Sequence, residues 1–355
     1  METPSPADDT ADQEPSSVGP LVVASFQIGI GVVGILGNGL CFFVLRLQSK
    51  TNNTNWLIVN QCSTDLITSV LLIAATVHLQ WFAAPPTTPG LAAELYCRLW
   101  DSRIIYFTGF AISSFNLTLI SLERYLAVLH PILYMTKFKR RTMYTMAALS
   151  WLTAPILQAV MLFVQFDFDS GQCNYISTGP AIGVVVFFWE YFIPVSIMGY
   201  CFICISFKLR SLNRVTEASI EANTSSVAPQ ESRENRDESS VAQNTELSTV
   251  AKDRDKTPAQ ASNPSEAQGN VRRRNITITL LIVYLSYLVC WTPNQFVFLV
   301  FNFGKIPNYI GSTWHIFTTI LATLNICVNP VVYALRYKDF RRGLREALGC
   351  CLGKP

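Results

Sequence analysis

Apolar residues along the chain gather in long windows that polar stretches separate. Within the windows, apolar and polar residues do not alternate with the period of two that membrane β-strands require. A hydrocarbon core of roughly 30 Å needs about 20 apolar residues per helix, and lipid offers the backbone no hydrogen-bond partners. The pattern therefore predicts an all-α membrane protein with seven spanning helices. The windows are 21–46, 55–80, 99–129, 142–164, 178–207, 275–302 and 309–335.

The polar stretches divide the chain into a tail, a bundle and one long loop. Residues 1–20 are polar and acidic, and they predict a disordered extracellular tail before the bundle, which spans 21–335. Inside the bundle, residues 215–270 are rich in Ser, Asn, Gln and Ala and almost free of aromatics. Such a segment buries too little apolar surface to offset its chain entropy. It is predicted to be a disordered third cytoplasmic loop.

Residues 336–355 follow the last window and predict an amphipathic helix with a short cytoplasmic tail. Apolar residues recur there at i, i+4 and i+8, namely Phe340, Leu344 and Leu348. Basic residues lie between them, a pattern typical of a helix on a membrane surface. Cys350 and Cys351 come directly afterwards, where reversible palmitoylation is expected.

Composition and charge agree with a membrane protein and set its orientation. Of 355 residues, 50% are hydrophobic and only 14% are charged, against about a quarter charged in soluble proteins. Basic residues at the window ends concentrate on the side opposite the N-terminus. They are Lys137, Lys139, Arg140, Arg141, Lys208, Arg210, Arg272, Arg273, Arg274, Arg341 and Arg342. The bias predicts a multi-pass protein with its N-terminus outside; the net charge of +3 gives no indication of nucleic-acid binding.

The ten cysteines separate by their expected side of the membrane. Only Cys97 and Cys173 face the oxidising exterior, so they form the predicted disulfide. The bond would tie the outer end of the third helix to the loop after the fourth. That loop, 165–175, alternates polar and apolar residues around a Ser-Gly turn and predicts a hairpin.

Each predicted helix also carries polar or proline residues, which are costly in a membrane and usually functional. In chain order they are Gly37-Asn38, Asp65, Glu123-Arg124-Tyr125, Trp151, Pro194, Cys290-Trp291-Thr292-Pro293 and Asn329-Pro330-Val331-Val332-Tyr333. In this order, one set per helix, they resemble the motifs of rhodopsin-like, G-protein-coupled receptors. The stretch 122–131 is similar to neuropeptide receptors of the galanin and somatostatin type.

The resemblance implies a plasma-membrane receptor, not an enzyme, that binds an extracellular ligand and activates heterotrimeric G proteins. Arrestin and membrane lipids are the further expected partners. The residues expected to act in activation and coupling are Glu123, Arg124, Tyr125, Trp291, Pro293, Asn329, Pro330 and Tyr333. Glu123 and Arg124 would form an ion pair at the cytoplasmic rim, and Trp291 would couple the ligand to rotation of the sixth helix.

Asp65 is a lone carboxylate at the middle of the membrane, and Ser113, Asn325 and Asn329 offer further oxygens near it. Hard cations prefer several oxygen ligands, and the set resembles the allosteric sodium site of the family. The alternative is a neutral Asp65 held by hydrogen bonds. No other cofactor is expected.

The sequence limits the class of ligand mainly by excluding two kinds of receptor. Window 309–335 lacks the lysine of opsins, and Ile104 and Tyr106 stand where amine receptors carry an aspartate. The candidate lining residues are Gln80, Arg103, Tyr106, Phe107, Glu190, Trp291, Gln295, Phe298, His315 and Thr319. Their polar and aromatic character favours a peptide; a small polar metabolite, or no ligand in a constitutively active receptor, are the alternatives.

Glu190 leaves three interpretations open: it pairs with a ligand cation, with a basic residue of the receptor, or, when protonated, with a neighbouring helix. The spacing from Cys97 to Arg124 is two residues longer than usual in the family, so a bulge or an earlier start of the third helix is expected. A transporter or proton pump with Asp65, Glu123 and Glu190 as a relay is the competing class. The inverted repeats and broken helix pairs of such proteins are absent from the sequence.

Overall fold

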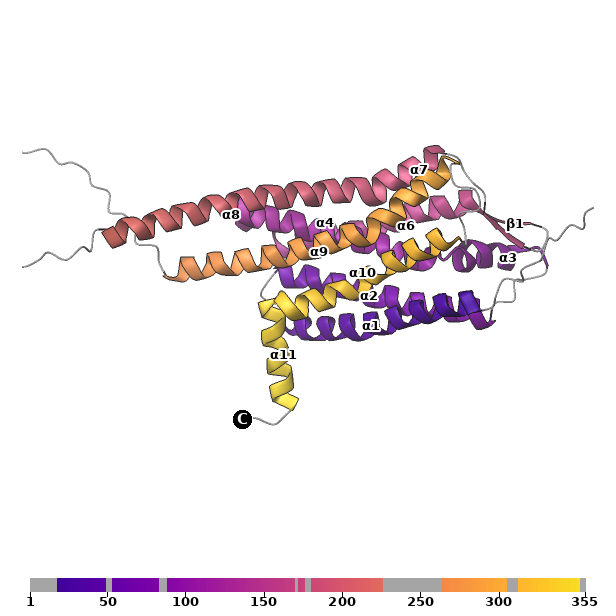
Figure 1. Ribbon diagram of the computed structural model, residues 1–355, viewed down its shortest axis with the longest axis horizontal. Helices are drawn as coiled ribbons and strands as arrows, with labels where there is room; N and C mark the ends of the chain where they lie inside the picture. Colours follow the sequence, from indigo (N-terminus) through magenta and orange to yellow (C-terminus); the bar gives the residue numbers. More distant parts are fainter. Residues whose placement is uncertain are drawn as a thin grey trace, which may run out of the picture. The chain divides into compact units, whose positions relative to one another are not determined.

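The structure is a computed structural model that describes residues 18–48, 53–82, 88–169, 172–175, 180–225, 264–304 and 312–351. Within these ranges, seven helices are long and apolar enough to cross a membrane (Figure 1). They are α1 (Val18–Gln48), α2 (Asn53–Val77), α4 (Ile104–Leu129), α6 (Arg140–Gln165), α8 (Ile193–Ser225), α9 (Pro264–Asn302) and α10 (Thr313–Arg336). Each overlaps one predicted window, which confirms the predicted seven-helix bundle.

The chain forms two compact units. The first comprises Met1–Ile205 with Asn275–Pro355 and contains the bundle, and the second is Ser206–Arg274. The described part of the second unit is helical, because it holds the end of α8 and the start of α9.

The predicted boundaries of the two unstructured segments need correction. Helix α8 continues to Ser225 and α9 begins at Pro264, so both edges of the predicted loop 215–270 are helical. Proline is favoured at the first helical position, and the Glu, Ala and Gln that follow it here are good helix formers. Similarly, α1 begins at Val18. Residues 226–263 and 1–17 lie outside the described residues.

One end of the bundle, here called the hairpin end, carries short elements, some of which belong to the spans Asn53–Phe82 and Pro180–Leu212. A π-helical turn, η1 (His78–Phe82), extends α2; α3 (Leu91–Leu95) and η2 (Tyr96–Asp101) precede α4; α7 (Pro180–Val186) and η3 (Phe187–Phe192) precede α8. Strands β1 (Phe166–Asp169) and β2 (Gln172–Tyr175) pair antiparallel with Phe168 opposite Cys173, which confirms the predicted hairpin.

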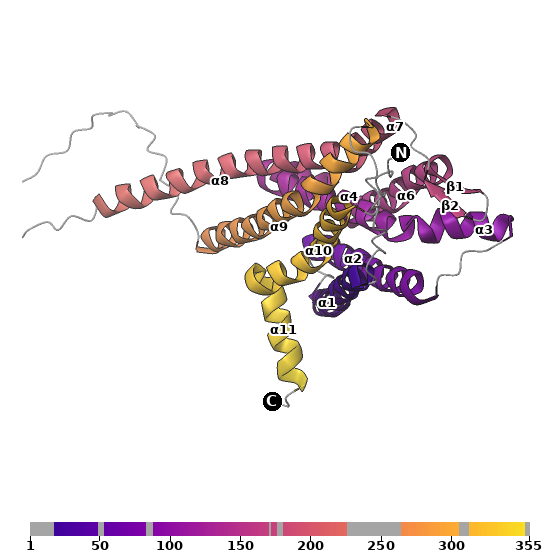
Figure 2. The same ribbon diagram turned by 45° about the vertical axis from the view of Figure 1, so that its right-hand side comes forward.

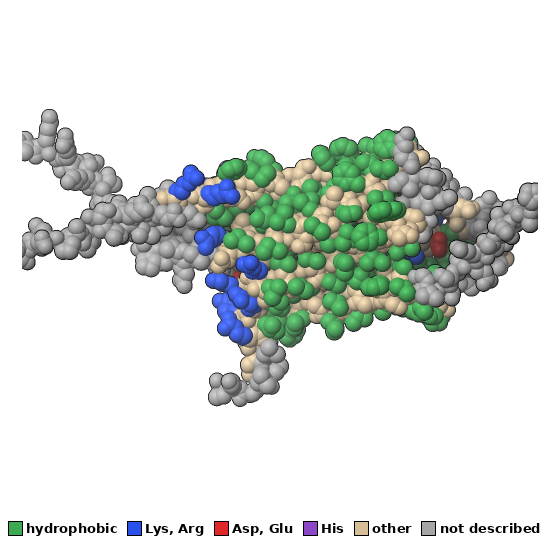
Figure 3. All heavy atoms as spheres, viewed as in Figure 1, with side chains coloured by type: hydrophobic (Ala, Val, Ile, Leu, Met, Phe, Trp, Pro, Cys, Tyr) green, Lys and Arg blue, Asp and Glu red, His purple; other side chains and the backbone are tan. Residues whose placement is uncertain are grey.

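The opposite end, here called the α11 end, carries α5 (Pro131–Lys137) and α11 (Lys338–Cys351). Helix α11 turns steeply away from α10 and contacts α1 (Figures 1 and 2). Phe340 is buried against the bundle while Arg341 and Arg345 are exposed, as expected of an amphipathic surface helix. Figure 3 shows apolar side chains around the middle of the bundle and Lys and Arg side chains around α11.

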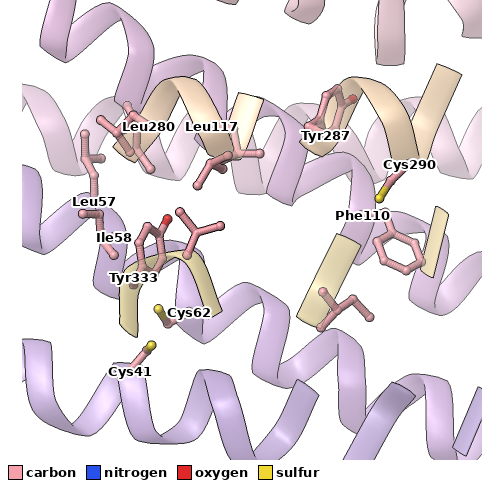
Figure 4. Packing of buried hydrophobic residues seen from close by; sticks show 14 of the residues in the cluster. Cys41, Leu57, Ile58, Cys62, Phe110, Leu117, Leu280, Tyr287, Cys290 and Tyr333 are labelled. Carbon is pink, nitrogen blue, oxygen red and sulfur yellow. The ribbon is translucent and has the colours of Figure 1, made fainter. Parts of the chain in front are cut away.

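A continuous cluster of buried apolar side chains runs along the inside of the bundle. Figure 4 shows Leu57, Ile58 and Tyr333 toward one end of the cluster and Phe110 beside Cys290 toward the other. Small residues let the helices approach closely, as is typical where lipid supplies no hydrophobic drive. A Cβ atom at Gly34 of α1 would lie 2.3 Å from Ser69 Oγ of α2. The close packing of α1, α2, α4 and α10 holds the polar residues described next.

Candidate functional site

A cavity of about 710 Å³ opens at the hairpin end. Helices α1, α2, α4 and α10 and strand β2 contribute to its lining. Its buried polar side chains are Gln27, Thr76, Tyr106 and Thr319, which are at most 7% exposed. Asp101 and Asn174 lie at its rim and are exposed. Ligand pockets for small molecules typically measure about 300–1,000 Å³, so the cavity has a suitable size.

The disulfide and an unusual backbone turn shape the mouth of this cavity. Cys97 of η2 is bonded to Cys173 of β2, with their Cα atoms 5.3 Å apart, as predicted. Arg103, immediately before α4, has φ 60° and ψ 13°, and it is the one described residue other than glycine with a positive φ. A left-handed conformation costs an L-residue roughly 1–2 kcal/mol. The turn separates the π-helical η2, which holds Cys97, from α4.

Asp101, at the mouth of the cavity, interacts electrostatically with Arg103 and with Tyr96. Partial burial raises the pKa of Asp101, and the Arg103 guanidinium partly opposes this shift. Burial, with a smaller contribution from Asp101, also raises the pKa of Tyr96. Ionised Asp101 is therefore disfavoured by its surroundings.

Asp65 is the centre of a buried polar network in the middle of the bundle. Its Oδ1 accepts a hydrogen bond from Ser113 Oγ at 2.9 Å, and its Oδ2 accepts one from Asn329 Nδ2 at 2.8 Å. Gln61 Nε2, a partner not anticipated from the sequence, lies 3.1 Å from both carboxylate oxygens. Gln61 Oε1 in turn accepts from Asn116 Nδ2 at 2.7 Å. The network joins α2, α4 and α10.

The composition of this network fits a hard cation such as sodium. Asp65 is 1% exposed, and the carbonyl oxygen of Asn329, which bonds Asp65 through its amide nitrogen, is buried without a hydrogen-bond partner among the described residues. The carbonyl oxygen of Asn325, one turn earlier on α10, is likewise buried and without a partner there. A carboxylate, a hydroxyl and two amide carbonyls are the oxygen donors that such ions prefer. These residues would hold the ion, and Asp65 would supply the only formal negative charge of the site.

At the α11 end, Arg124 is held within its own helix. Its Nε donates to Glu123 Oε2 at 2.5 Å, and its Nη2 donates to Glu123 Oε1. Glu123 is fully buried and also accepts from Tyr134 at 2.6 Å and from Thr54 at 3.2 Å. Burial and the Glu123 carboxylate raise the pKa of Tyr134 to about 12, so its hydroxyl remains a donor. The buried carboxylate thus has three donors, as a charged group in a protein interior requires.

Aromatic rings connect the cavity to the middle of the bundle. Tyr106, which lines the cavity, meets Phe110 edge-on with ring centroids 6.1 Å apart. Phe110 meets Trp291 at 5.2 Å, and Trp291 lies 6.2 Å from Tyr287. The Tyr287 hydroxyl is 2.7 Å from Ser114 Oγ of α4. Movement of a ring at the cavity can therefore reach α9 through direct packing.

Comparison with known proteins identifies this arrangement. A family model described as 7 transmembrane receptor (rhodopsin family) matches residues 37–333. The chain belongs to this family. Galanin receptor 2a of Danio rerio is 26% identical to it over 334 residues, which cover 90% of this chain and 76% of that relative. Octopamine receptor beta-2R of Chilo suppressalis is 25% identical over 336 residues, which cover 90% of this chain and 78% of the relative.

A solved structure shares the fold of the receptor. Squid rhodopsin matches it with a TM-score of 0.69 and 16% identity, over 96% of this chain and 88% of that one. At this identity the match establishes the fold alone. In the receptor, α11 takes the place of the short helix after the seventh span.

The structure brings together six of the ten ligand-site residues predicted from the sequence. Those lining the cavity are Gln80, Arg103, Tyr106, Phe107, His315 and Thr319. Trp291, Gln295, Phe298 and Glu190 are not among its lining residues in the described part of the receptor. The cavity therefore lies toward α1, α2 and α10. Polar residues that sequence reasoning missed include Gln27, whose position in the apolar run of α1 was a usable signal.

Glu190 of η3 faces another helix in the structure. Its Oε1 accepts a 2.5 Å hydrogen bond from Gln158 Nε2 of α6, and its backbone oxygen accepts from Ser114 at 3.4 Å. The contact with a neighbouring helix is the one that the third interpretation of Glu190 names, and the protonation that this interpretation includes stays a prediction.

The remaining residues predicted to act in activation lie on α4, α9 and α10. Tyr125 packs against the rings of His130 and Tyr200, with centroids 5.7 and 5.9 Å apart. Pro293 and Pro330 lie inside α9 and α10, where each removes a backbone hydrogen bond and permits a bend. Tyr333 is fully buried, and its hydroxyl has no partner among the described residues.

The side chains of Cys350 and Cys351 lie outside the described residues, so palmitoylation stays a prediction. Among the described residues, no group of three or more His, Cys, Asp and Glu side chains is placed to hold a metal ion.

Proposed function

We propose that this receptor binds an extracellular ligand in the cavity at the hairpin end and, in response, activates a heterotrimeric G protein at the α11 end. The observation that carries the proposal is that one helix serves both places. Helix α4 begins beside Arg103 and Tyr106 at the cavity and holds Arg124 near its other end. Its 26 residues span about 39 Å at 1.5 Å per residue, enough to cross the membrane.

The proposed orientation places the hairpin end outside and the α11 end in the cytoplasm of a plasma-membrane protein. Lys and Arg around α11 and at the start of α6 support it through the positive-inside bias. The Cys97–Cys173 disulfide supports it independently, since such bonds persist in oxidising surroundings.

Activation, in this proposal, releases Arg124 from Glu123 so that its guanidinium meets the G protein. A ligand in the cavity displaces Tyr106, and the contacts from Phe110 to Trp291 pass the movement to α9. Pro293 is the point at which α9 bends. The ligand shifts the equilibrium only by its difference in affinity between the two states.

A peptide is the ligand class that the cavity mouth favours. The hairpin of β1 and β2 contributes Asn174 to the lining, and extended peptides bind well to exposed strand edges. A volume of about 710 Å³ admits the end of a peptide chain rather than a whole one. Two relatives point to different classes, one named as a galanin receptor and one as an octopamine receptor.

The proposal includes arrestin as a second cytoplasmic partner and lipid contact through α11. Leu344 packs toward the bundle while Arg341, Arg342 and Arg345 are exposed, which suits a helix lying at an anionic membrane surface. Acylation at Cys350 and Cys351 would add the second anchoring signal that stable attachment requires.

The test is nucleotide exchange on a G protein by Arg124→Ala. Wild-type and mutant receptors are expressed with promiscuous G proteins, and exchange is measured while a neuropeptide and metabolite library is screened. Arg141→Ala is the matched control, because Arg141 is an exposed basic residue at the same end. We expect Arg124→Ala to abolish exchange at unchanged surface expression and Arg141→Ala to preserve it. Equal exchange by wild type and Arg124→Ala would remove the proposal.

A further inference from the structure

The buried part of the cavity presents hydrogen-bond donors and no carboxylate. Its buried polar lining is Gln27, Thr76, Tyr106 and Thr319. Thr76 Oγ1 donates to Gln27 Oε1 at 3.2 Å, so the amide oxygen of Gln27 already accepts one hydrogen bond and the N–H groups of the amide are donors. Asp101 is the carboxylate of the described lining, and it stands at the exposed rim.

Arg103 adds a positive charge to the same lining. Among the described residues, no carboxylate lies within ion-pair distance of its guanidinium. Asp101, two residues away, interacts with it only at longer range. The left-handed backbone at Arg103 places this residue between η2 and α4, at the cavity. A cation held in a partly desolvated cavity without a close counter-ion favours an anion.

A second and independent observation concerns the same cavity. Thr319 of α10 is 4% exposed, and its hydroxyl has no hydrogen-bond partner among the described residues. An unpaired buried hydroxyl costs about 1–3 kcal/mol, and a hydrogen-bond acceptor that enters the cavity beside Thr319 would recover that cost. Tyr106, 1% exposed and close enough to Arg103 to interact with it, lines the same cavity.

We propose that the ligand of this receptor presents a carboxylate to Arg103, with the hydroxyls of Thr319 and Tyr106 as further donors. The inference rests on the proposed function, since it names the chemistry of that ligand. An ionised carboxylate only accepts hydrogen bonds, and the guanidinium fork matches it with two parallel N–H donors. A phosphate group, with its greater charge, would require a second fixed cation, and Arg103 is the one Lys or Arg in the described lining.

The experiment measures thermal stabilisation of the purified, disulfide-intact receptor by small probes. Benzoate and hexanoate are compared with benzamide and hexanamide, which keep the shape but lose the charge, and with benzylamine. A ligand that binds only the folded state raises the unfolding temperature in proportion to its occupancy. We expect both carboxylates to stabilise the wild type and the amides and the amine to leave it unchanged.

Variants of Arg103 assign the effect to the guanidinium. We expect Arg103→Gln to raise the half-saturating concentration of benzoate at least tenfold, equivalent to about 1.4 kcal/mol. Arg103→Lys should retain part of the binding, because it keeps the charge without the fork. Arg103→Asn serves if Arg103→Gln folds poorly, since Asn adopts the left-handed conformation more readily. Thr319→Val should weaken benzoate by a smaller factor.

Asp101→Asn is the matched control at the rim. This substitution removes a negative charge that would repel a carboxylate, so benzoate binding should strengthen or stay unchanged. The proposal is overturned if no carboxylate stabilises the wild type or if benzamide stabilises it as much as benzoate does. It is also overturned if Arg103→Gln binds benzoate as tightly as the wild type does, or if benzylamine alone stabilises the receptor and this effect depends on Asp101. None of these measurements involves a G protein, so failure of carboxylate binding and failure of nucleotide exchange are separate results.

Discussion

Tyr134 lies on the short helix α5, and its hydroxyl donates a 2.6 Å hydrogen bond to Glu123 Oε1. Replacing Tyr134 by Phe removes this bond and preserves the ring, which stacks on Phe138 with centroids 5.6 Å apart. The Glu123 carboxylate, which holds Arg124, would then accept one hydrogen bond fewer. We therefore expect Tyr134→Phe to raise the basal activity of the receptor.

The size of the effect follows from the charge of the acceptor. Hydrogen bonds to charged groups contribute about 1.5–3 kcal/mol, and the lower end applies because Tyr134 is only half-buried. If the bond exists in the inactive state alone, a loss of about 1.4 kcal/mol shifts the equilibrium toward the active state about tenfold. Basal nucleotide exchange should rise by the same factor while the active fraction remains small.

The assay is ligand-free nucleotide exchange on G protein in membranes with matched receptor number. Thr54→Val is a graded comparison, because the Thr54 bond to Glu123 is longer, 3.2 Å, and should matter less. Tyr144→Phe controls for loss of a tyrosine hydroxyl elsewhere, since Tyr144 is an exposed residue whose ring packs on Trp56. Basal exchange that stays at the wild-type level in Tyr134→Phe would refute the reasoning, because the bond would then be present equally in both states.

Three further predictions concern the bundle and its mouth. Cys97→Ser and Cys173→Ser should each impair surface expression or ligand response, and the double mutant should be no worse than either single one; free thiols at both positions by mass spectrometry would contradict this. Asp65→Asn should abolish any sodium dependence of agonist affinity, because an amide is a poorer ligand for a hard cation; identical salt titrations would leave Asp65 a structural residue. Burial raises the pKa of Asp101, so folding favours the protonated form of this side chain. As pH rises through that pKa, the unfolding temperature of the wild type should therefore fall relative to that of Asp101→Asn. Parallel curves of unfolding temperature against pH for the two proteins would exclude the effect.

The sequence determined the fold class, because the bilayer imposes a length and an apolar composition on every span. It also determined the Cys97–Cys173 bond, since these are the two cysteines expected on the oxidising, extracellular side of the membrane. The hairpin between them was predictable from its alternation and its Ser-Gly turn. These properties are local or depend on the side of the membrane, so they need no knowledge of which helices touch.

Only the tertiary structure decided which polar side chains meet. Glu190 has the same apolar neighbours in sequence whether it faces a ligand or Gln158, and the rotation of η3 against α6 selects Gln158. Gln61 joins Asp65, and Tyr134 joins Glu123, because separate helices pack at particular rotations. Helix rotation arises from side-chain packing over the whole bundle, and a single sequence does not display it.

The position of the cavity has the same origin. The sequence contained the cation of the cavity, Arg103, and the aromatic residues of its lining. The left-handed turn that places Arg103 at the mouth joins η2 to α4, and the Cys97–Cys173 disulfide ties η2 to strand β2. Gln27 entered the lining because α1 packs closely on α2. Residue types along the chain thus determined which chemistry the receptor carries, and long-range packing decided where that chemistry converges.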